Sequence, residues 1–310
     1  LLILTMGSTV EAASRDCTSS EKQDGNAQLT AIQSDQQRTQ SIISRHLPLG
    51  LHKSTHAAQG GPDNEQLLVQ GGYTLLHDND LRTALWVSYK LTKTDIQGAS
   101  GKDRVNCFRD DPRLSDGASK SDYNDPIFDQ GHMANDADMK DVVTEQVNTY
   151  MMSNISPQYC RFNRGVWLSL EHLGRKWAND YDEIFITSGA VFNFNSRDAR
   201  DKDKSAARMG SRNQKARVAV PSDYYKVFTK KVGNKWHTIT FMLEHNNEEN
   251  GTAWESVRPL MLASIVTLED VEAVAEISIH PAIDREGIVQ NHLVQWDLTA
   301  NKANFESSCD

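Results

Sequence analysis

The chain has 310 residues, of which 38% are hydrophobic and 24% charged, so it can bury a full core in one large domain or two ordinary ones. Its formal net charge of −9 argues against a protein that coats nucleic acid through overall charge, although it leaves room for a local cationic cleft. No stretch approaches the roughly 20 consecutive apolar residues needed to span a bilayer.

The first residues are typical of the end of a secretion signal. A short apolar run precedes Val10-Glu11-Ala12, which has the small-x-small pattern of a signal cleavage site. The chain starts with Leu1, so we expect the basic start of the signal to be missing. We therefore interpret residues 1–12 as a residual signal peptide, with a buried N-terminal strand as the alternative.

Residues 13–46 are polar and contain few apolar side chains, so we expect an N-terminal extension or a peripheral helix. The composition changes at "HLPLGLHKS", and we assign residues 47–285 to the main domain. Residues 286–310 are then a C-terminal tail, which a disulfide of Cys309 would hold in place.

The four cysteines are even in number and form no C-x-x-C pair, which argues against a zinc site. In an exported chain they favour two disulfides. Three pairings are compatible with the sequence. We expect Cys107–Cys160 within the core and Cys17–Cys309 between the tails, with buried free thiols as the alternative.

Residues 84–91, "ALWVSYKL", alternate in the manner of a strand, and residues 183–192, "EIFITSGAVF", have the composition of a buried strand. Residues 216–243 predict two further strands around a turn at Gly233-Asn234. No alternation of strands and helices and no internal repeat is present. The predicted fold class is therefore α+β, with a central, mainly antiparallel sheet flanked by helices.

Residues 128–136, "FDQGHMAND", place a histidine behind an acid, an amide and a glycine. His132 is the candidate for chemistry, because a neutral imidazole with a pKa near about 6.5 accepts a proton at physiological pH. Gly131 removes a side chain where the backbone would approach a substrate. The simplest explanation of Asp129 is that it fixes its local turn.

A helix is expected over residues 163–180, after a segment that contains Asn154 and ends at Pro157. At about 100° per residue, the apolar residues of this helix fall on one stripe, which we expect to face the core. The stripe contains Val166, Leu170, Leu173 and Trp177. The adjacent polar flank contains Asn163, Glu171 and Arg175.

Each residue of that flank also has a simpler explanation. Asn163 is suited to cap the helix, and Glu171 with Arg175 would make an i,i+4 surface pair worth about 0.2–0.5 kcal/mol.

A second helix is predicted over residues 267–277, with Thr267 as its N-cap in a capping box.

Residues 195–217 contain eight lysines and arginines but only three acids, in a chain that is acidic overall. This is the local charge that a polyanion requires, and Arg208 and Arg212 are candidates for substrate binding. The alternative is a solvated surface loop.

Together, the segments "DQGHMAN", "SNISPQ", "FNRGVW" and "LEHLGRKW" resemble the DNA/RNA non-specific endonuclease family, whose active site is a ββα-metal finger. The family motif is D-R-G-H, then S-N-x-x-P-Q, then N-x-G-x-W with a glutamate eight residues after that asparagine. Here Asn163 lies nine residues after Asn154 and eight before Glu171, which matches this spacing. The resemblance extends over about residues 47–285.

The resemblance implies a role for each matching position. His132 matches the general base that deprotonates water, and Asn163 matches the only direct protein ligand of one Mg²⁺, with Mn²⁺ as an alternative ion. Glu171 matches a group that holds a water of this ion. Arg175 matches the phosphate-binding arginine, and Asn154 matches a residue that shapes the site.

Two glutamines complete the candidate site. Gln158 is expected to shape the site and contact the substrate. Gln130 stands where the family has an arginine, and an amide supplies no charge. If that arginine stabilises the transition state, its loss would slow hydrolysis about 10²–10³-fold unless Arg175 or the basic segment compensates.

The predicted function is a secreted, Mg²⁺-dependent endonuclease that hydrolyses DNA and RNA and leaves 5′-phosphate ends. Both substrates are expected because attack by water does not need a 2′-hydroxyl. No membrane and no obligate protein partner is expected. A weakened relative that binds extracellular nucleic acid without efficient cleavage is the main alternative, which Gln130 supports. A toxin that requires an immunity protein is a third interpretation.

Overall fold

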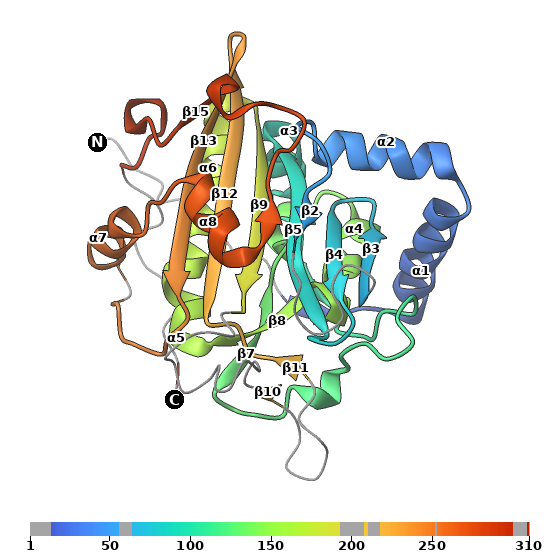
Figure 1. Cartoon of the computed structure of the whole chain (residues 1–310). Helices are drawn as coiled ribbons and strands as arrows, with labels where there is room; N and C mark the ends of the chain where they lie inside the picture. The colour runs from blue at the N-terminus through green and yellow to red at the C-terminus, as the bar shows by residue number, and fades with distance from the viewer. Residues whose placement is uncertain are drawn as a thin grey trace, which may run out of the picture.

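The computed structural model describes residues 14–55, 64–192, 208–209, 218–251, 253–299 and 309. A seven-stranded sheet lies at its centre, in the order β15-β13-β12-β9-β5-β4-β3 (Figure 1). The strands are β3 (Glu65–Val69), β4 (Thr74–Asp78), β5 (Thr83–Thr92), β9 (Glu183–Val191), β12 (Asp223–Val232), β13 (Lys235–Glu244) and β15 (Ile288–Gln290). Neighbouring strands are antiparallel except β13 and β15, which confirms the predicted α+β class.

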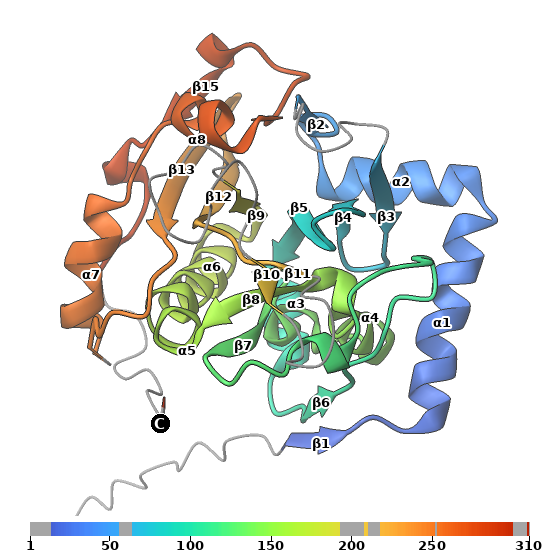
Figure 2. The same ribbon diagram turned by 60° about the horizontal axis from the view of Figure 1, so that its bottom comes forward.

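Helices cover both faces of this sheet. Figures 1 and 2 show α6 (Leu168–Tyr181) against one face and α8 (Leu268–Ala275) against the other. The helices α1 (Ser19–Gln33) and α2 (Gln36–His46) lie beside β3 and β4. The remaining helices are α3 (Lys93–Ala99), α4 (Val143–Thr149), α5 (Cys160–Phe162) and α7 (Trp254–Ala263). None of the helices in the described ranges is long and apolar enough to cross a bilayer.

Four short pairs of strands complete the described part of the chain. β1 (Ser14–Asp16) runs parallel to β6 (Arg104–Asn106), and β7 (Phe128–His132) runs antiparallel to β8 (Ile155–Tyr159). The other pairs are β2 (Lys53–Ser54) with β14 (Ile277–Ser278) and β10 (Arg208–Met209) with β11 (Val218–Ala219). β7, β8 and the helix that follows them form a ββα unit, in which β8 contacts β5 of the central sheet (Figure 2).

The strand predictions are confirmed by β5, β9 and the β12–β13 hairpin. The hairpin turns at Gly233-Asn234, where Gly233 adopts a φ of 59° that suits a two-residue turn. α8 begins after the predicted cap Thr267, whose side chain forms a capping box with Asp270.

The predicted core face of the 163–180 helix is also confirmed, because its four apolar residues are at most 1% exposed. The start of this helix was predicted wrongly. The helical segment begins at Cys160, and Asn163 is the first residue of a π-helical turn, Asn163–Trp167, so Asn163 is not the N-cap of this helix. The backbone kinks within this turn at Gly165, whose φ of −106° and ψ of −105° are not helical.

The polar N-terminal segment contributes more to the core than its composition indicates. Ile32 from α1 and Ile42 and Ile43 from α2 are at most 8% exposed and belong to the main hydrophobic cluster. The apolar residues are sparse, but they lie on the faces that pack against the sheet, so few are needed.

The predicted disulfide pairing is wrong. The bonds are Cys17–Cys107 and Cys160–Cys309, with Cα–Cα distances of 5.2 Å and 5.7 Å. β1 pairs with β6 in the parallel direction and brings Cys17 beside Cys107, whereas Cys309 is bonded to Cys160 at the start of α5. The disulfide pairing depends on which distant segments the strands bring together, and the spacing of the cysteines does not predict that.

Gly189 in β9 provides a test of the sheet packing. A Cβ atom at this position would lie 2.0 Å from Cζ of the buried Tyr225, so Gly189→Ala must displace the ring. We expect the variant to lose about 1–3 kcal/mol of unfolding free energy, measured by chemical denaturation. In a Tyr225→Leu background the alanine should be tolerated better, and an equal loss in both backgrounds would contradict this account.

Candidate active site

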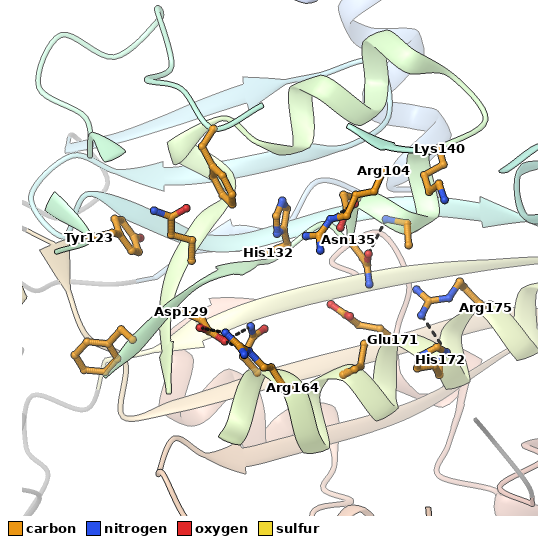
Figure 3. Close-up of a pocket in the computed structure, with 17 residues that line it drawn as sticks. Arg104, Tyr123, Asp129, His132, Asn135, Lys140, Arg164, Glu171, His172 and Arg175 are labelled. Carbon is orange, nitrogen blue, oxygen red and sulfur yellow. Dashed lines mark hydrogen bonds and ion pairs between the residues drawn. The ribbon is translucent and has the colours of Figure 1, made fainter. Parts of the chain in front are cut away.

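A cavity of about 750 Å³ opens between β7, the π-helical turn with α6, and β6 (Figure 3). It brings together five of the predicted site residues from segments far apart in the sequence, namely Gln130, His132, Asn163, Glu171 and Arg175. Arg212 and the side chain of Arg208 lie outside the described residues. In Figure 3, Asp129 lies to one side of His132 and Glu171 to the other.

His132 is held at the end of β7 by aromatic packing. Its ring lies 4.7 Å from that of Tyr150 and 5.6 Å from that of Phe108, and the residue is 8% exposed. Burial lowers the pKa of His132 to about 4, Asp136 opposes this shift, and the Arg104 guanidinium adds to it. The imidazole is therefore neutral at physiological pH, with a pKa below the ordinary value that we expected from the sequence.

One ring nitrogen of His132 is turned into the protein. Nε2 is buried and has no hydrogen-bond partner among the described residues, while the residue as a whole lines the cavity. A neutral histidine holds one proton on one nitrogen and accepts at the other. The packing thus favours an imidazole that accepts a proton from the cavity side.

Asn163 is oriented by Asp129. Its amide Nδ2 donates a hydrogen bond of 2.9 Å to Oδ2 of Asp129, so the amide oxygen faces away from the carboxylate. Asp129 also accepts two hydrogen bonds from Arg164, of 2.8 Å and 2.9 Å. Asp129 lies within β7 and connects strand to helix, so the prediction that it fixes a local turn is wrong.

The donors around this cavity fit a loosely held divalent cation. The described residues contain no group of three His, Cys, Asp or Glu side chains that could hold a metal ion, so an all-protein cage is not present there. The Asn163 amide oxygen is a hard, neutral donor whose orientation is fixed, and Glu171 adds a carboxylate to the same cavity. Mg²⁺ commonly binds through one or two protein oxygens and keeps several waters.

Glu171 lies in a buried cluster of charges. It is 9% exposed, and burial raises its pKa, whereas Lys226 and Arg175 lower it. Lys226 is 1% exposed, its ammonium lies 4.0 Å from the centre of the Trp167 ring, and burial lowers its pKa. The cations oppose the cost of burying the carboxylate.

Arg175 does not form the surface pair with Glu171 that was the simpler alternative. Its Nη1 donates a 2.9 Å hydrogen bond to the buried Asp138, which also accepts one of 2.8 Å from Tyr89. The guanidinium is therefore fixed at the cavity wall, where it can meet a phosphate without first losing its conformational freedom.

Asn154 lies behind the cavity rather than in it. The side chain is fully buried, with its Oδ1 accepting from Ala134 N at 2.9 Å and its Nδ2 donating to the carbonyls of Ala134 and Thr149. These bonds fix the backbone just after His132. The structure thus gives Asn154 a positioning task in the site.

Gln158 also lies behind the cavity, with no exposed surface. A Cβ atom on Gly131 would lie 2.2 Å from Oε1 of Gln158, so the glycine makes room for this side chain. The prediction that Gly131 lets the backbone approach a substrate is therefore replaced by an internal packing requirement.

The sequence did not identify the cations Arg104 and Lys140, which line the same cavity. Arg104 lies in β6, where Nε donates to the Tyr150 hydroxyl at 2.8 Å and pairs with Asp136 at 3.1 Å. Its side chain is still half exposed and supplies positive charge near His132. No pattern in the sequence indicates that β6 lies near β7, so only the folded chain shows that Arg104 lies near His132.

Comparison with known proteins supports a common ancestry for this arrangement. The family model described as DNA/RNA non-specific endonuclease matches residues 53–286. A nuclease of Nostoc sp. is 32% identical over 150 residues, which cover 47% of this chain and 53% of that protein. Human mitochondrial endonuclease G is 30% identical over 174 residues, which cover 55% of this chain and 57% of that protein. The chain thus aligns with little more than half the length of these relatives.

A chain in the crystal structure of the EndoG/EndoGI complex shares the fold. The match covers 80% of this chain and 95% of the other, with a TM-score of 0.64 and 22% sequence identity.

The positioning task of Asn154 is testable. Asn154→Ala leaves buried backbone groups of Ala134 and Thr149 without partners, so we expect it to lose about 2–4 kcal/mol of unfolding free energy in urea denaturation. Asn179→Ala, on the exposed side of α6, is the matched control and should stay near wild type. Wild-type stability combined with lost activity in Asn154→Ala would instead assign this side chain to the chemistry.

Proposed function

Since this chain belongs to the DNA/RNA non-specific endonuclease family, we propose that it is a Mg²⁺-dependent endonuclease that hydrolyses DNA and RNA to products with 5′-phosphate ends. The observation that carries the proposal is the convergence of a neutral histidine and an oriented asparagine amide on one cavity. His132 comes from a strand and Asn163 from a helix, so a phosphodiester between them would meet both.

His132 is the general base of the proposed reaction. Its neutral imidazole accepts a proton from the water whose oxygen attacks phosphorus. The aromatic rings of Phe108 and Tyr150 hold the imidazole in one orientation, so little freedom is lost when the substrate binds.

Asn163 would hold the divalent ion through its amide oxygen, and Glu171 would hold one of the waters around the ion. The ion supplies positive charge that stabilises the phosphate and the leaving 3′-oxygen. Asp129 keeps the amide nitrogen turned away from the ion, because the carboxylate accepts its hydrogen bond. We favour Mg²⁺, with Mn²⁺ as an alternative, since a single neutral oxygen donor suits a hard, largely hydrated cation.

The cations of the cavity would neutralise the phosphate. Gln130 lines the cavity but supplies no charge, whereas the guanidinium groups of Arg104 and Arg175 lie in the same wall. From the sequence, we expected Arg175 or the basic segment, residues 195–217, to compensate for the missing charge at Gln130. Arg104 adds a third candidate. Its guanidinium pairs with Asp136, but the side chain is half exposed, so it would offer electrostatic stabilisation of the transition state.

We further propose that the protein is exported. The signal-like residues 1–12 motivate this localisation, and the Cys17–Cys107 and Cys160–Cys309 bonds support it, because disulfides persist in oxidising compartments.

A nucleic-acid-binding relative with weak cleavage is the second candidate. It is favoured by the neutral Gln130 in the cavity and by the low pKa of His132, which makes the imidazole a weaker base. The two candidates differ in whether bound nucleic acid is cut.

Digestion of plasmid DNA and of RNA with Mg²⁺ or EDTA tests the proposal. We expect cutting only with the metal ion, and we expect His132→Ala and Asn163→Ala to lose nearly all of it. Asp129→Asn should keep a measurable part, about 10–100-fold below wild type, because the amide of Asn163 is less firmly oriented. Binding of both substrates without metal-dependent cutting would favour the second candidate.

The pH dependence of cleavage tests the role of His132. Because its pKa is lowered to about 4, the imidazole stays neutral until the pH falls that far, so kcat/KM should rise with pH through about 4 and be level near neutrality. Phe108→Ala should admit water to the His132 ring, so the half-point of the pH profile of this variant should move upward toward about 6.5. A wild-type half-point already near 6.5, with circular dichroism showing a folded protein throughout, would contradict the buried imidazole.

A further inference from the structure

A second hollow adjoins the proposed catalytic cavity. It has a volume of about 310 Å³, and Lys140 lines both spaces. Strand β6 forms a shared wall, with Arg104 in the cavity and Val105 in the hollow. Figure 2 shows β6 and β1 side by side at the lower edge of the molecule, beyond β7 and β8.

The hollow has an excess of positive charge. Its cations are Arg15, Lys102 and Lys140, and Asp103 is the only carboxylate in its lining. Arg15 is neutralised by Glu21, to which it donates hydrogen bonds of 2.6 Å and 3.0 Å. The charge that a ligand would meet is therefore set by the two lysines against the single carboxylate of Asp103, and it remains positive.

Neither lysine is paired with a carboxylate among the described residues. Lys102 donates a 2.5 Å hydrogen bond to the backbone carbonyl of Asp141, and its charge also attracts the Asp141 carboxylate without a direct ion pair. Lys140 forms no hydrogen bond or ion pair with any residue in the described ranges, and Figure 3 shows its side chain at the end of the cavity beside Arg104. Two ammonium groups without a direct ion pair in the described residues thus lie one after the other beyond the cavity.

We propose that the nucleic-acid strand leaves the catalytic cavity past Arg104 and continues through this hollow, where Lys140 and Lys102 contact backbone phosphates next to the scissile one. The inference rests on the proposed function and extends its substrate site. Lysine contacts to phosphates add affinity and register but no base specificity, which suits a nuclease acting on many sequences.

The continuity of the two spaces favours this occupant. A strand whose scissile phosphate lies in the cavity holds its next phosphates close to Lys140 at a high effective concentration, so weak contacts with the lysines suffice. The lining of the hollow combines its charged side chains with Val105 and Val143, and its lysines supply the positive charge that follows a nucleic-acid backbone.

The test compares Lys140→Gln, Lys102→Gln and the double variant with Lys53→Gln and Lys235→Gln. The two control lysines are exposed, lie in β2 and β13, and give the same change of charge away from the hollow. For each protein, kcat/KM on a long single-stranded DNA is divided by kcat/KM on bis(4-nitrophenyl) phosphate, which has no neighbouring phosphate. We expect this ratio to fall about 3–10-fold for each single variant of the hollow and to stay unchanged in the controls.

Binding of the same DNA in EDTA provides an independent readout. The slope of log Kd against log salt should become shallower by roughly 0.7 for each lysine removed from the hollow. Ratios and slopes equal to those of the controls would overturn the inference even if the wild type cuts DNA. If the wild type cuts neither substrate, the proposed function fails, and the salt slopes still decide whether nucleic acid follows this path.

Discussion

The site depends on the contact between the Asp129 carboxylate and the helix that carries Asn163. One carboxylate accepts hydrogen bonds from the Asn163 amide and from Nε and Nη2 of Arg164. It therefore holds a strand against a helix and also fixes the orientation of the amide. An asparagine side chain with free rotation would present nitrogen as readily as oxygen. The contact therefore converts a neutral side chain into a defined oxygen donor, with the negative charge of Asp129 neutralised by Arg164.

Burial has opposite consequences for the groups that surround this contact. It keeps His132 neutral, which suits a proton acceptor, but it opposes the ionised form of Glu171. Lys226 lies in the apolar layer beneath the site, where its charge and that of Arg175 favour the carboxylate. A buried lysine without a hydrogen-bond partner is destabilising by itself, so its position is best understood through the charge of Glu171.

The N-terminal segment connects the global fold to the substrate surface. The Cys17–Cys107 bond and the β1–β6 pairing hold β6 in place, and β6 carries Arg104 at the boundary between the cavity and the neighbouring hollow. Phe108, next to the disulfide, packs on His132. A segment whose composition indicated only a peripheral extension thus supports one wall of the proposed active site.

The sequence by itself determined the features that depend on neighbouring residues: the hairpin at Gly233-Asn234, the cap of α8 and the core stripe of the 163–180 helix. These features follow from hydrophobic periodicity and local hydrogen bonding, both of which depend on residues close together in the sequence. The family motif also indicated which side chains would gather around His132. Tertiary structure alone decided the disulfide pairing, the space that Gln158 requires beside Gly131 and the approach of Arg104 to the site. These depend on contacts between segments far apart in the chain, whose geometry is set by packing and strand pairing.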